Sequence, residues 1–156
     1  MEAVSGFVQK RQEVNKSRTA ERMMKSEKLS FVATATDAVA FFCAALPREQ
    51  KEEHVFVLPL DANGKVLAKP ILVSVGSEDG TTVIDAGAIF RAALKADAEE
   101  IIIAHNHPSG DVKPSKADIA TTKELTELAG RLHVKFLDHL ILAGDKFLSF
   151  KERNLI

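Results

Sequence analysis

Residues 99–118, EEIIIAHNHPSGDVKPSKAD, join a continuous apolar run to a dense group of polar side chains. The run EEIIIAH is typical of a strand that is covered on both faces of a sheet. Helical patterns precede and follow it, over residues 85–98 and 115–131, with Asp85 and Ser115 at the positions where a helix begins. A buried strand between two helices predicts a layered α/β fold.

Further elements surround this central unit. Residues 29–35, LSFVATA, predict a strand, and Thr36 or Asp37 is expected to cap a helix that ends near Pro47. Residues 134–150 predict an antiparallel pair of strands at the end of the chain. The alternation of strands and helices extends the layered α/β pattern over most of the sequence.

A β-hairpin is predicted over residues 54–75, HVFVLPLDANGKVLAKPILVSV. Asn63 and Gly64 lie between two apolar runs, and this dipeptide strongly favours a tight turn. Pro59 cannot donate a hydrogen bond to a strand ladder, so it indicates a sheet edge or a bulge in the first arm. The hairpin makes the predicted sheet a mixed one.

The composition is that of an ordinary globular domain. The chain has 156 residues, 46% of them hydrophobic and 28% charged, and a formal net charge of -1. This balance argues against a nucleic-acid footprint over the whole surface, although it leaves room for a local basic patch. Cys43 lies in the apolar segment AVAFFCAAL and is interpreted as a core residue. A single cysteine and the lack of a signal or membrane segment predict a cytoplasmic protein.

The chain divides into two parts by charge. Residues 1–28 contain seven basic and four acidic residues, with apolar side chains near helical spacing, and predict a basic helical extension. Residues 29–156 form the predicted domain. The extension is interpreted as a helix that docks on the domain or on a partner subunit, with a nucleic-acid-binding arm as the alternative.

The polar group after the apolar strand has the geometry of a metal site. His105 and His107 are two residues apart on a strand, so their side chains point to the same face. The turn at residues 108–110 and the helix that begins at Ser115 can return Asp118 to the same point. Two imidazoles and a carboxylate are a ligand set of catalytic zinc. Alternatively, Ser115 and Asp118 form only a helix capping box, and each histidine is structural.

These residues also resemble a known family. The string HNHPSGD at residues 105–111, followed by Ser115, Asp118 and the LDH of residues 137–139, resembles the JAMM motif of JAB/MPN-domain metalloproteases, in the bacterial RadC branch. The resemblance extends from about residue 33 to the end of the chain. It implies a three-layer α/β/α fold similar to that of cytidine deaminases.

The resemblance also implies roles for individual residues. The implied zinc ligands are His105, His107 and Asp118. A glutamate near the start of an upstream strand is expected to accept a proton from the attacking water; Glu53 matches this position, and Glu52 is the second choice. Ser115 is expected to donate a hydrogen bond to the tetrahedral oxyanion.

Three further polar residues have weaker indications. Asp111 is interpreted as a turn residue rather than a ligand, because the motif already supplies a carboxylate. Asp138 and His139 match a pair in the family, and two interpretations stay open for them. They either orient a ligand imidazole or make an ordinary structural hydrogen bond.

Two functions are compatible with the sequence. The first is a zinc-dependent hydrolase that cleaves a peptide or isopeptide bond in a peptide or protein substrate. The alternative is a non-catalytic scaffold or DNA-repair-associated binding module with a structural or vestigial metal. Residues 1–32 are too short for the helix-hairpin-helix module common in RadC-like proteins, which weakens the DNA association. A base deaminase is excluded because its paired cysteines and His-x-Glu are absent.

Overall fold

The computed structural model describes residues 18, 21–22, 30–77 and 84–156. Its helices in these residues are α2 (Ala35–Ala45), α3 (Ala86–Lys95) and α4 (Lys116–Arg131). Its strands are β1 (His54–Leu60), β2 (Ile71–Val75), β3 (Glu100–Asn106), β4 (Lys135–Ala143) and β5 (Lys146–Ser149). The predicted α/β class is therefore confirmed.

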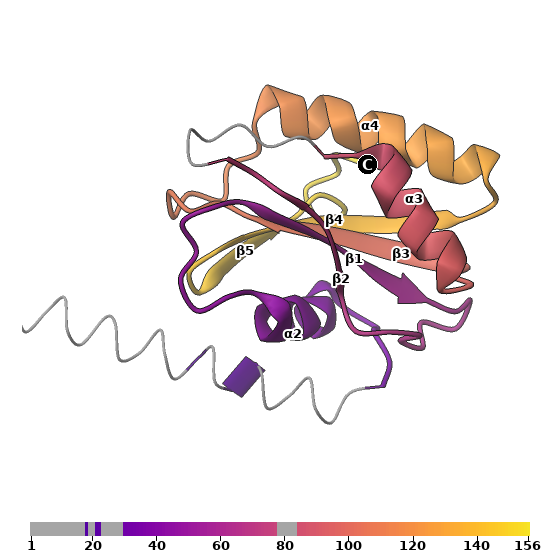
Figure 1. Ribbon diagram of the computed structural model, residues 1–156, viewed down its shortest axis with the longest axis horizontal. Coiled ribbons are helices and arrows are strands. Elements are labelled where there is room, and N and C mark those ends of the chain that lie inside the picture. Colours follow the sequence, from indigo (N-terminus) through magenta and orange to yellow (C-terminus); the bar gives the residue numbers. More distant parts are fainter. Residues whose placement is uncertain (1–17, 19–20, 23–29, 78–83) are drawn as a thin grey trace, which may run out of the picture.

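The strands form one mixed sheet with the order β2-β1-β3-β4-β5 (Figure 1). The central strand β3 is antiparallel to β1 and parallel to β4. The parallel pair needs a crossover, which α4 provides between β3 and β4. The strand predicted from EEIIIAH thus occupies the middle of the sheet.

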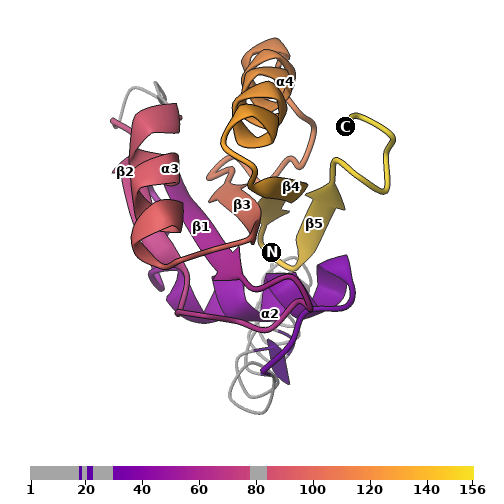
Figure 2. The same cartoon turned by 90° about the vertical axis from the view of Figure 1, so that its right-hand side faces the viewer.

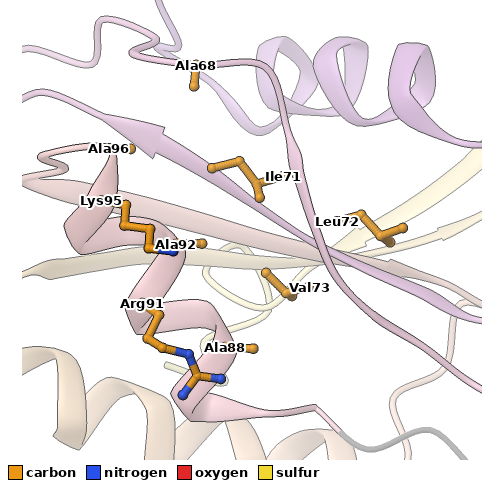
Figure 3. Close-up of a pocket in the computed structure, with 9 residues that line it drawn as sticks. All are labelled: Ala68, Ile71, Leu72, Val73, Ala88, Arg91, Ala92, Lys95 and Ala96. Carbon is orange, nitrogen blue, oxygen red and sulfur yellow. The ribbon is translucent and has the colours of Figure 1, made fainter.

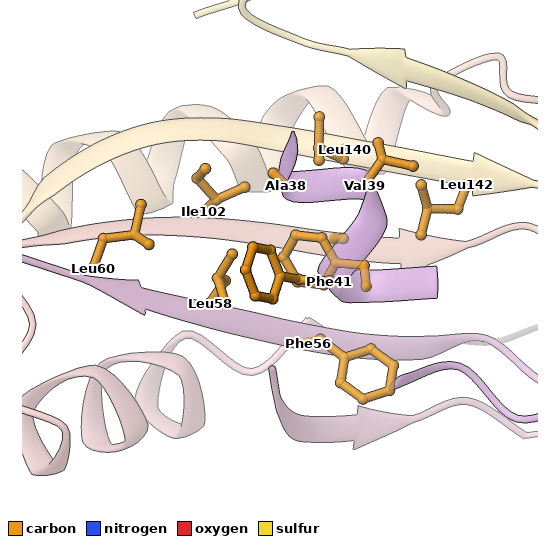
Figure 4. Close-up of a cluster of buried hydrophobic side chains, with 11 residues drawn as sticks. Ala38, Val39, Phe41, Phe56, Leu58, Leu60, Ile102, Leu140 and Leu142 are labelled. Carbon is orange, nitrogen blue, oxygen red and sulfur yellow. The ribbon is translucent and has the colours of Figure 1, made fainter. Parts of the chain in front are cut away.

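Helices cover both faces of this sheet. Helix α2 lies on one face, and α3 and α4 lie on the other (Figures 1 and 2). The side chains of β3 alternate between the two layers. Ile102, shown in Figure 4, and Ala104 pack in the cluster that contains α2. Ile101 and Ile103 pack in the cluster that contains α3 and α4. The three-layer α/β/α arrangement follows from a central strand that is apolar on both faces.

Helix α2 begins earlier than the sequence predicted. Thr34 caps it by accepting a hydrogen bond from the Asp37 backbone, and the Asp37 carboxylate accepts one from the Thr34 backbone. The expected cap at Thr36 or Asp37 was wrong, because Asp37 serves as the third helical residue of a capping box. The strand expected just before this helix is also absent from the described residues, where Phe31 makes only an isolated bridge with Lys65.

The predicted hairpin is present with a longer connection. Gly64 has φ of 80°, and the Asp61 carboxylate accepts hydrogen bonds from the backbones of Asn63 and Lys65, which closes the turn. Strand β2 starts only at Ile71, because Leu60 makes an isolated bridge with Val66 rather than a continuous ladder. The tight turn is therefore correct, and the pairing that follows it is interrupted.

Pro59 lies inside the sheet rather than at its edge. The register irregularity between β1 and β2 falls between Val55 and Phe56, away from the proline. The carbonyl of Pro59 accepts a hydrogen bond from Leu67 at 3.0 Å, so the proline nitrogen faces the same side, away from β3. The ladder to β2 has already ended at Val57 on that side, so no strand bond is lost. The predicted edge or bulge at Pro59 was wrong.

Several other predictions are confirmed. Asp85 caps α3, and β4 and β5 form the predicted antiparallel pair. Cys43 packs against the α2 cluster, and burial raises the pKa of its thiol, as expected of a core residue. Within the described part of the chain, no helix has the length and apolar character needed to cross a membrane.

Most of the predicted N-terminal extension lies outside the described residues. The exceptions, Arg18, Glu21 and Arg22, are helical. Arg18 forms an ion pair with Asp145 at 2.8 Å, and Arg22 donates to the backbone carbonyl of the same aspartate at 3.0 Å. Arg18 and Arg22 therefore contact the turn between β4 and β5.

The glycine at the hairpin turn provides a test of the fold. We expect Gly64→Ala to lower the free energy of unfolding by about 2 kcal/mol, because positive φ is costly for alanine. In addition, a Cβ at Gly64 would lie 2.7 Å from the carbonyl oxygen of Val32. Thermal unfolding monitored by circular dichroism measures the change.

Gly130 provides the matched control. It lies in α4, and a Cβ there would meet no atom within 4 Å. Gly130→Ala should leave stability unchanged or raise it by up to about 1 kcal/mol, because alanine favours helices. Equal melting temperatures for the two variants would contradict the turn geometry.

Candidate metal centre

The two histidines of the motif converge at the end of β3. His105 is buried and His107 half-buried, and their Nε2 atoms are 3.0 Å apart. Asp118 approaches from α4, with Oδ1 3.4 Å from Nε2 of His105 and Oδ2 3.5 Å from Nε2 of His107. The three residues form a cluster whose candidate ligand atoms all lie within 4.8 Å of one another.

Asp118 has two structural roles at once. Ser115 caps α4 by accepting a hydrogen bond from the Asp118 backbone at 3.0 Å, and Oδ2 of Asp118 accepts one from the Ser115 backbone at 2.8 Å. The capping box considered from the sequence is therefore present, and it fixes the carboxylate beside the histidines. The metal and capping interpretations of this pair do not exclude each other.

Within the cluster, Asp118 and His107 favour the charged forms of one another. Burial alone would raise the pKa of Asp118, but hydrogen bonds and positive charge from His105 and His107 in their protonated forms hold that pKa well below its usual range. The hydrogen bond to Asp118 raises the pKa of His107 against the effect of burial. The carboxylate thus stays ionised, and the site attracts positive charge.

A backbone carbonyl sets the tautomer of His107. Its Nδ1 lies 2.7 Å from the carbonyl oxygen of Asp111. Because a carbonyl only accepts, Nδ1 of the neutral ring carries the proton and Nε2 presents a lone pair. The Asp111 carboxylate accepts a hydrogen bond from the Lys113 backbone at 2.9 Å, which confirms its interpretation as a turn residue.

A chain of buried hydrogen bonds sets the tautomer of His105. Thr122 donates its hydroxyl proton to the carbonyl oxygen of Asp118 at 2.6 Å, so its oxygen must accept from Nδ1 of His139 at 2.7 Å. Nε2 of His139 is then unprotonated and accepts from Nδ1 of His105 at 2.7 Å. Nδ1 of His105 therefore carries a proton, so a neutral His105 has its lone pair on Nε2, directed at the cluster.

The protonation state of His139 agrees with this direction of the hydrogen bonds. Burial lowers the pKa of His139 well below its usual value, so the ring is neutral and carries a single proton. Phe150 stacks on it, with ring centroids 4.5 Å apart. His139 thus contacts the ligand imidazole, as one of the two interpretations from the sequence proposed.

Asp138 has the second role considered from the sequence, that of a structural hydrogen-bonding residue. Its carboxylate accepts hydrogen bonds from the backbones of His139 and Lys151 and from the Ser149 hydroxyl. Burial raises its pKa against these bonds. Asp138 therefore secures the turn after β5, which carries Phe150, and makes an ordinary structural contribution.

The donor set fits a metal ion. Two imidazoles and an ionised carboxylate face one another, and their candidate ligand atoms lie close enough together to hold one metal ion. Nitrogen and oxygen donors in this combination suit zinc rather than calcium or magnesium. The residues that would hold the ion are His105, His107 and Asp118.

Glu53 lies beside this cluster. The ladder between β1 and β3 ends at the pair Val55 and His105, and Glu53 and His107 each lie two residues beyond that pair. An open cavity is shared by Glu53, His107 and Ser115. Glu52 is absent from the lining of that cavity, so the structure distinguishes the two glutamates by position. The other lining residues are Lys51, Ser77, Pro108, Ser109, Asp111 and Lys113.

Comparison with known proteins agrees with this geometry. Residues 32–155 match the family described as the RadC-like JAB domain. The chain belongs to this family. The RadC-like JAB domain thus covers all of the described strands and helices except residues 18 and 21–22.

Similar chains occur in bacteria and archaea. The chain is 39% identical over 125 residues to a UPF0758 protein of Chlorobium chlorochromatii, which covers 80% of this chain and 55% of that protein. It is 34% identical over 131 residues to the UPF0758 protein TTE0897 of Caldanaerobacter subterraneus, covering 84% and 55%. A UPF0758 protein of Methanococcoides burtonii is 36% identical over 109 residues, covering 70% and 47%. The chain spans about half the length of these relatives.

A second cavity of the RadC-like JAB domain has a different character. It lies between β2 and α3, and Ala, Ile, Leu and Val side chains form most of its wall (Figure 3). Its two charged residues, Arg91 and Lys95, are both cations. No histidine, carboxylate or hydroxyl side chain lines it, so it offers no metal ligands or acid-base groups.

Two residues of the site were missed in the sequence analysis. Thr122 is fully buried and completes the hydrogen-bond chain to His105. Asn106, also fully buried, contacts the segment that carries Glu53. The signal for Thr122 is its place one helical turn after Asp118, and the signal for Asn106 is a polar residue at the end of a buried strand.

The hydrogen-bond chain makes Thr122 a test of the metal centre. We expect Thr122→Val to weaken zinc binding by about 10- to 100-fold, the usual cost of losing a partner of a ligand. Without the hydroxyl acceptor, the His139 proton can move to Nε2, which shifts the His105 proton onto the ligand nitrogen. Competition titration with a chromogenic chelator measures the dissociation constant.

Thr126→Val is the matched control. Thr126 lies one turn further along α4 and donates to the carbonyl oxygen of Thr122 at 2.8 Å. It does not contact His139, so its substitution should leave zinc affinity within about twofold. The same loss of affinity in both variants would show that helix stability, rather than the tautomer of His105, determines binding.

Proposed function

We propose that this chain is a zinc-dependent hydrolase that cleaves a peptide or isopeptide bond. The observation that carries the proposal is the shared cavity of Glu53, His107 and Ser115, immediately beside the cluster of His105, His107 and Asp118. A potential proton acceptor, a potential hydrogen-bond donor and three metal ligands thus meet at one surface. Membership of the RadC-like JAB family supports the choice of an amide bond.

The three ligands would hold the ion in the tautomeric and ionised states described above. When bound, zinc would lower the pKa of a water molecule and polarise the scissile carbonyl. The ion would have one carboxylate and two neutral imidazoles around it, which leaves room for water or substrate. Buried hydrogen bonds behind His105 keep this ligand in place while the cavity side stays open to substrate.

Glu53 is the proposed general base. From its place in the cavity that His107 also lines, it would take a proton from the attacking water and deliver that proton to the leaving amine. Its charge also contributes to the raised pKa of His107, which is consistent with a short separation. Glu52 has a different environment, because its backbone carbonyl accepts hydrogen bonds from Asn106 and His54.

Ser115 is the proposed oxyanion donor. Its hydroxyl oxygen accepts the capping hydrogen bond from Asp118, so the hydroxyl hydrogen can still be donated. Ser115 is exposed and lines the cavity, so this hydrogen can reach a bound substrate. Donation to the developing oxyanion would favour the transition state over the substrate.

The proposal predicts that substitution of Glu53 lowers activity without changing metal binding. We expect Glu53→Gln to keep zinc content at the wild-type level and to lower kcat by at least about 100-fold, because glutamine cannot accept the proton. The measurement is a quenched-fluorescence screen of peptide and isopeptide-linked substrates, followed by kinetics on the substrate that the wild type cleaves.

Glu52→Gln is the control for this experiment. It makes the same change of charge one residue earlier, outside the cavity lining, and should retain activity within about threefold. Full activity of Glu53→Gln would overturn the proposed role of Glu53. A wild type that binds zinc and cleaves none of the substrates would favour the alternative of a non-catalytic scaffold.

A further inference from the structure

We infer that Asn106, the residue between the two histidine ligands, is a positioning residue for Glu53. The inference rests on the proposed function, because it concerns the base of that reaction. Asn106 is fully buried at the end of β3. Its side chain cannot reach the metal face, because residues 105 and 107 point to one face of the strand and residue 106 to the other.

The Asn106 amide forms two hydrogen bonds to the segment before β1. Its Oδ1 accepts from the backbone N–H of His54 at 2.6 Å. Its Nδ2 donates to the backbone carbonyl of Glu52 at 3.0 Å. One side chain therefore bonds to the residue before Glu53 and to the residue after it.

These two contacts determine the orientation of the amide. An N–H group needs an acceptor and a carbonyl needs a donor, so only one orientation of the Asn106 amide satisfies both partners. A carboxylate of the same shape would place an oxygen against the Glu52 carbonyl. An apolar side chain would leave both backbone groups without this partner, at a cost for each buried group.

The contacts also determine where Glu53 points. The Glu52 carbonyl and the His54 N–H belong to the two peptide units that flank the Cα of Glu53. Holding both planes fixes φ and ψ of Glu53, and with them the direction of its Cα–Cβ bond. A third bond, from the backbone of Gly76 to the Glu53 carbonyl at 2.8 Å, secures the other side of the segment.

The arrangement ties the base to the ligands through one strand. Asn106 is covalently adjacent to both His105 and His107, and its amide holds the segment that carries Glu53. A displacement of about 1 Å at a reacting group can lower a rate by roughly 100-fold. Asn106 thus sets the distance between the proton acceptor and the metal ligands without contacting substrate.

The test uses the full chain with Asn106→Leu, which keeps the branched shape of the side chain and removes both hydrogen bonds. Val57→Ala is the control, because Val57 is fully buried in β1, the strand that follows Glu53, and is not among the residues that line the cavity. Both variants should lose stability. A change that results only from weaker packing around β1 should therefore appear in both variants, and a change in the Asn106 variant alone reports on its lost hydrogen bonds. If Asn106→Leu fails to fold, Asn106→Asp keeps the acceptor for His54 and removes only the donor.

The first measurement is independent of activity. Amide hydrogen exchange should be at least about tenfold faster at His54 in Asn106→Leu than in Val57→Ala, because the first loses the Oδ1 acceptor. NMR relaxation should show greater backbone mobility at Glu53 only in the Asn106 variants. Zinc content should equal that of the wild type. Unchanged exchange and mobility, or loss of zinc, would overturn the inference.

The second measurement is kinetic. On a peptide that the wild type cleaves, Asn106→Leu should lower kcat by about 10- to 100-fold with KM unchanged, whereas Val57→Ala should keep both values within about threefold. Equal losses in the two variants would overturn the positioning role while leaving the hydrolase intact. If the wild type cleaves nothing but exchange and mobility change as expected, the proposed function fails and the structural role of Asn106 stands.

Discussion

The hydrogen bond between Nδ1 of His105 and Nε2 of His139 controls what the cluster can bind. It is the last step of a chain that begins at the carbonyl oxygen of Asp118 and passes through the Thr122 hydroxyl. Because the carbonyl only accepts, and the hydroxyl and each neutral imidazole have one proton to donate, the direction at one end determines the direction at the other. The result is a lone pair on Nε2 of His105, which faces the second imidazole and the carboxylate.

The fold supplies the geometry for this chain. Strand β3 is central and paired on both sides, so the backbone of its last residues is held by β1 and by β4. Its alternation places the two histidines toward α4 and Asn106 toward the opposite face. Parallel pairing with β4 places His139 behind His105, and the capped start of α4 brings Asp118 and Thr122 over the same strand end.

The sequence predicted the parts of this arrangement that depend on local spacing. The two histidines follow from a period of two, the start of α4 from Ser115 and Asp118, and the layered sheet from a strand that is apolar on both faces. The resemblance to a family then suggested Glu53, which lines the same cavity as His107. The catalytic roles of Glu53 and Ser115 stay predictions, because position alone does not establish proton transfer.

The missed features depend on contacts between distant segments. The partner of His139 is 17 positions away, and the partner of Asn106 is 52 positions away, so no local pattern reveals either hydrogen bond. The Pro59 prediction was wrong for a similar reason: a proline in an inner strand is tolerated where the neighbouring ladder has already ended. The α2 cap was misplaced for a local reason, because Thr34 and Asp37 form a capping box whose threonine lies two residues before the expected cap at Thr36.

The central claim is that His105, His107 and Asp118 hold a zinc ion, and zinc content of the purified full chain by elemental analysis tests it most directly. The wild type should contain about one zinc per chain, and a His105→Ala, His107→Ala double variant should contain none. Asp111→Asn, which alters a carboxylate in the same cavity that is bonded to the Lys113 backbone, should keep its zinc. A wild type without zinc after metal is added back, or a double variant with as much zinc as the wild type, would contradict the account.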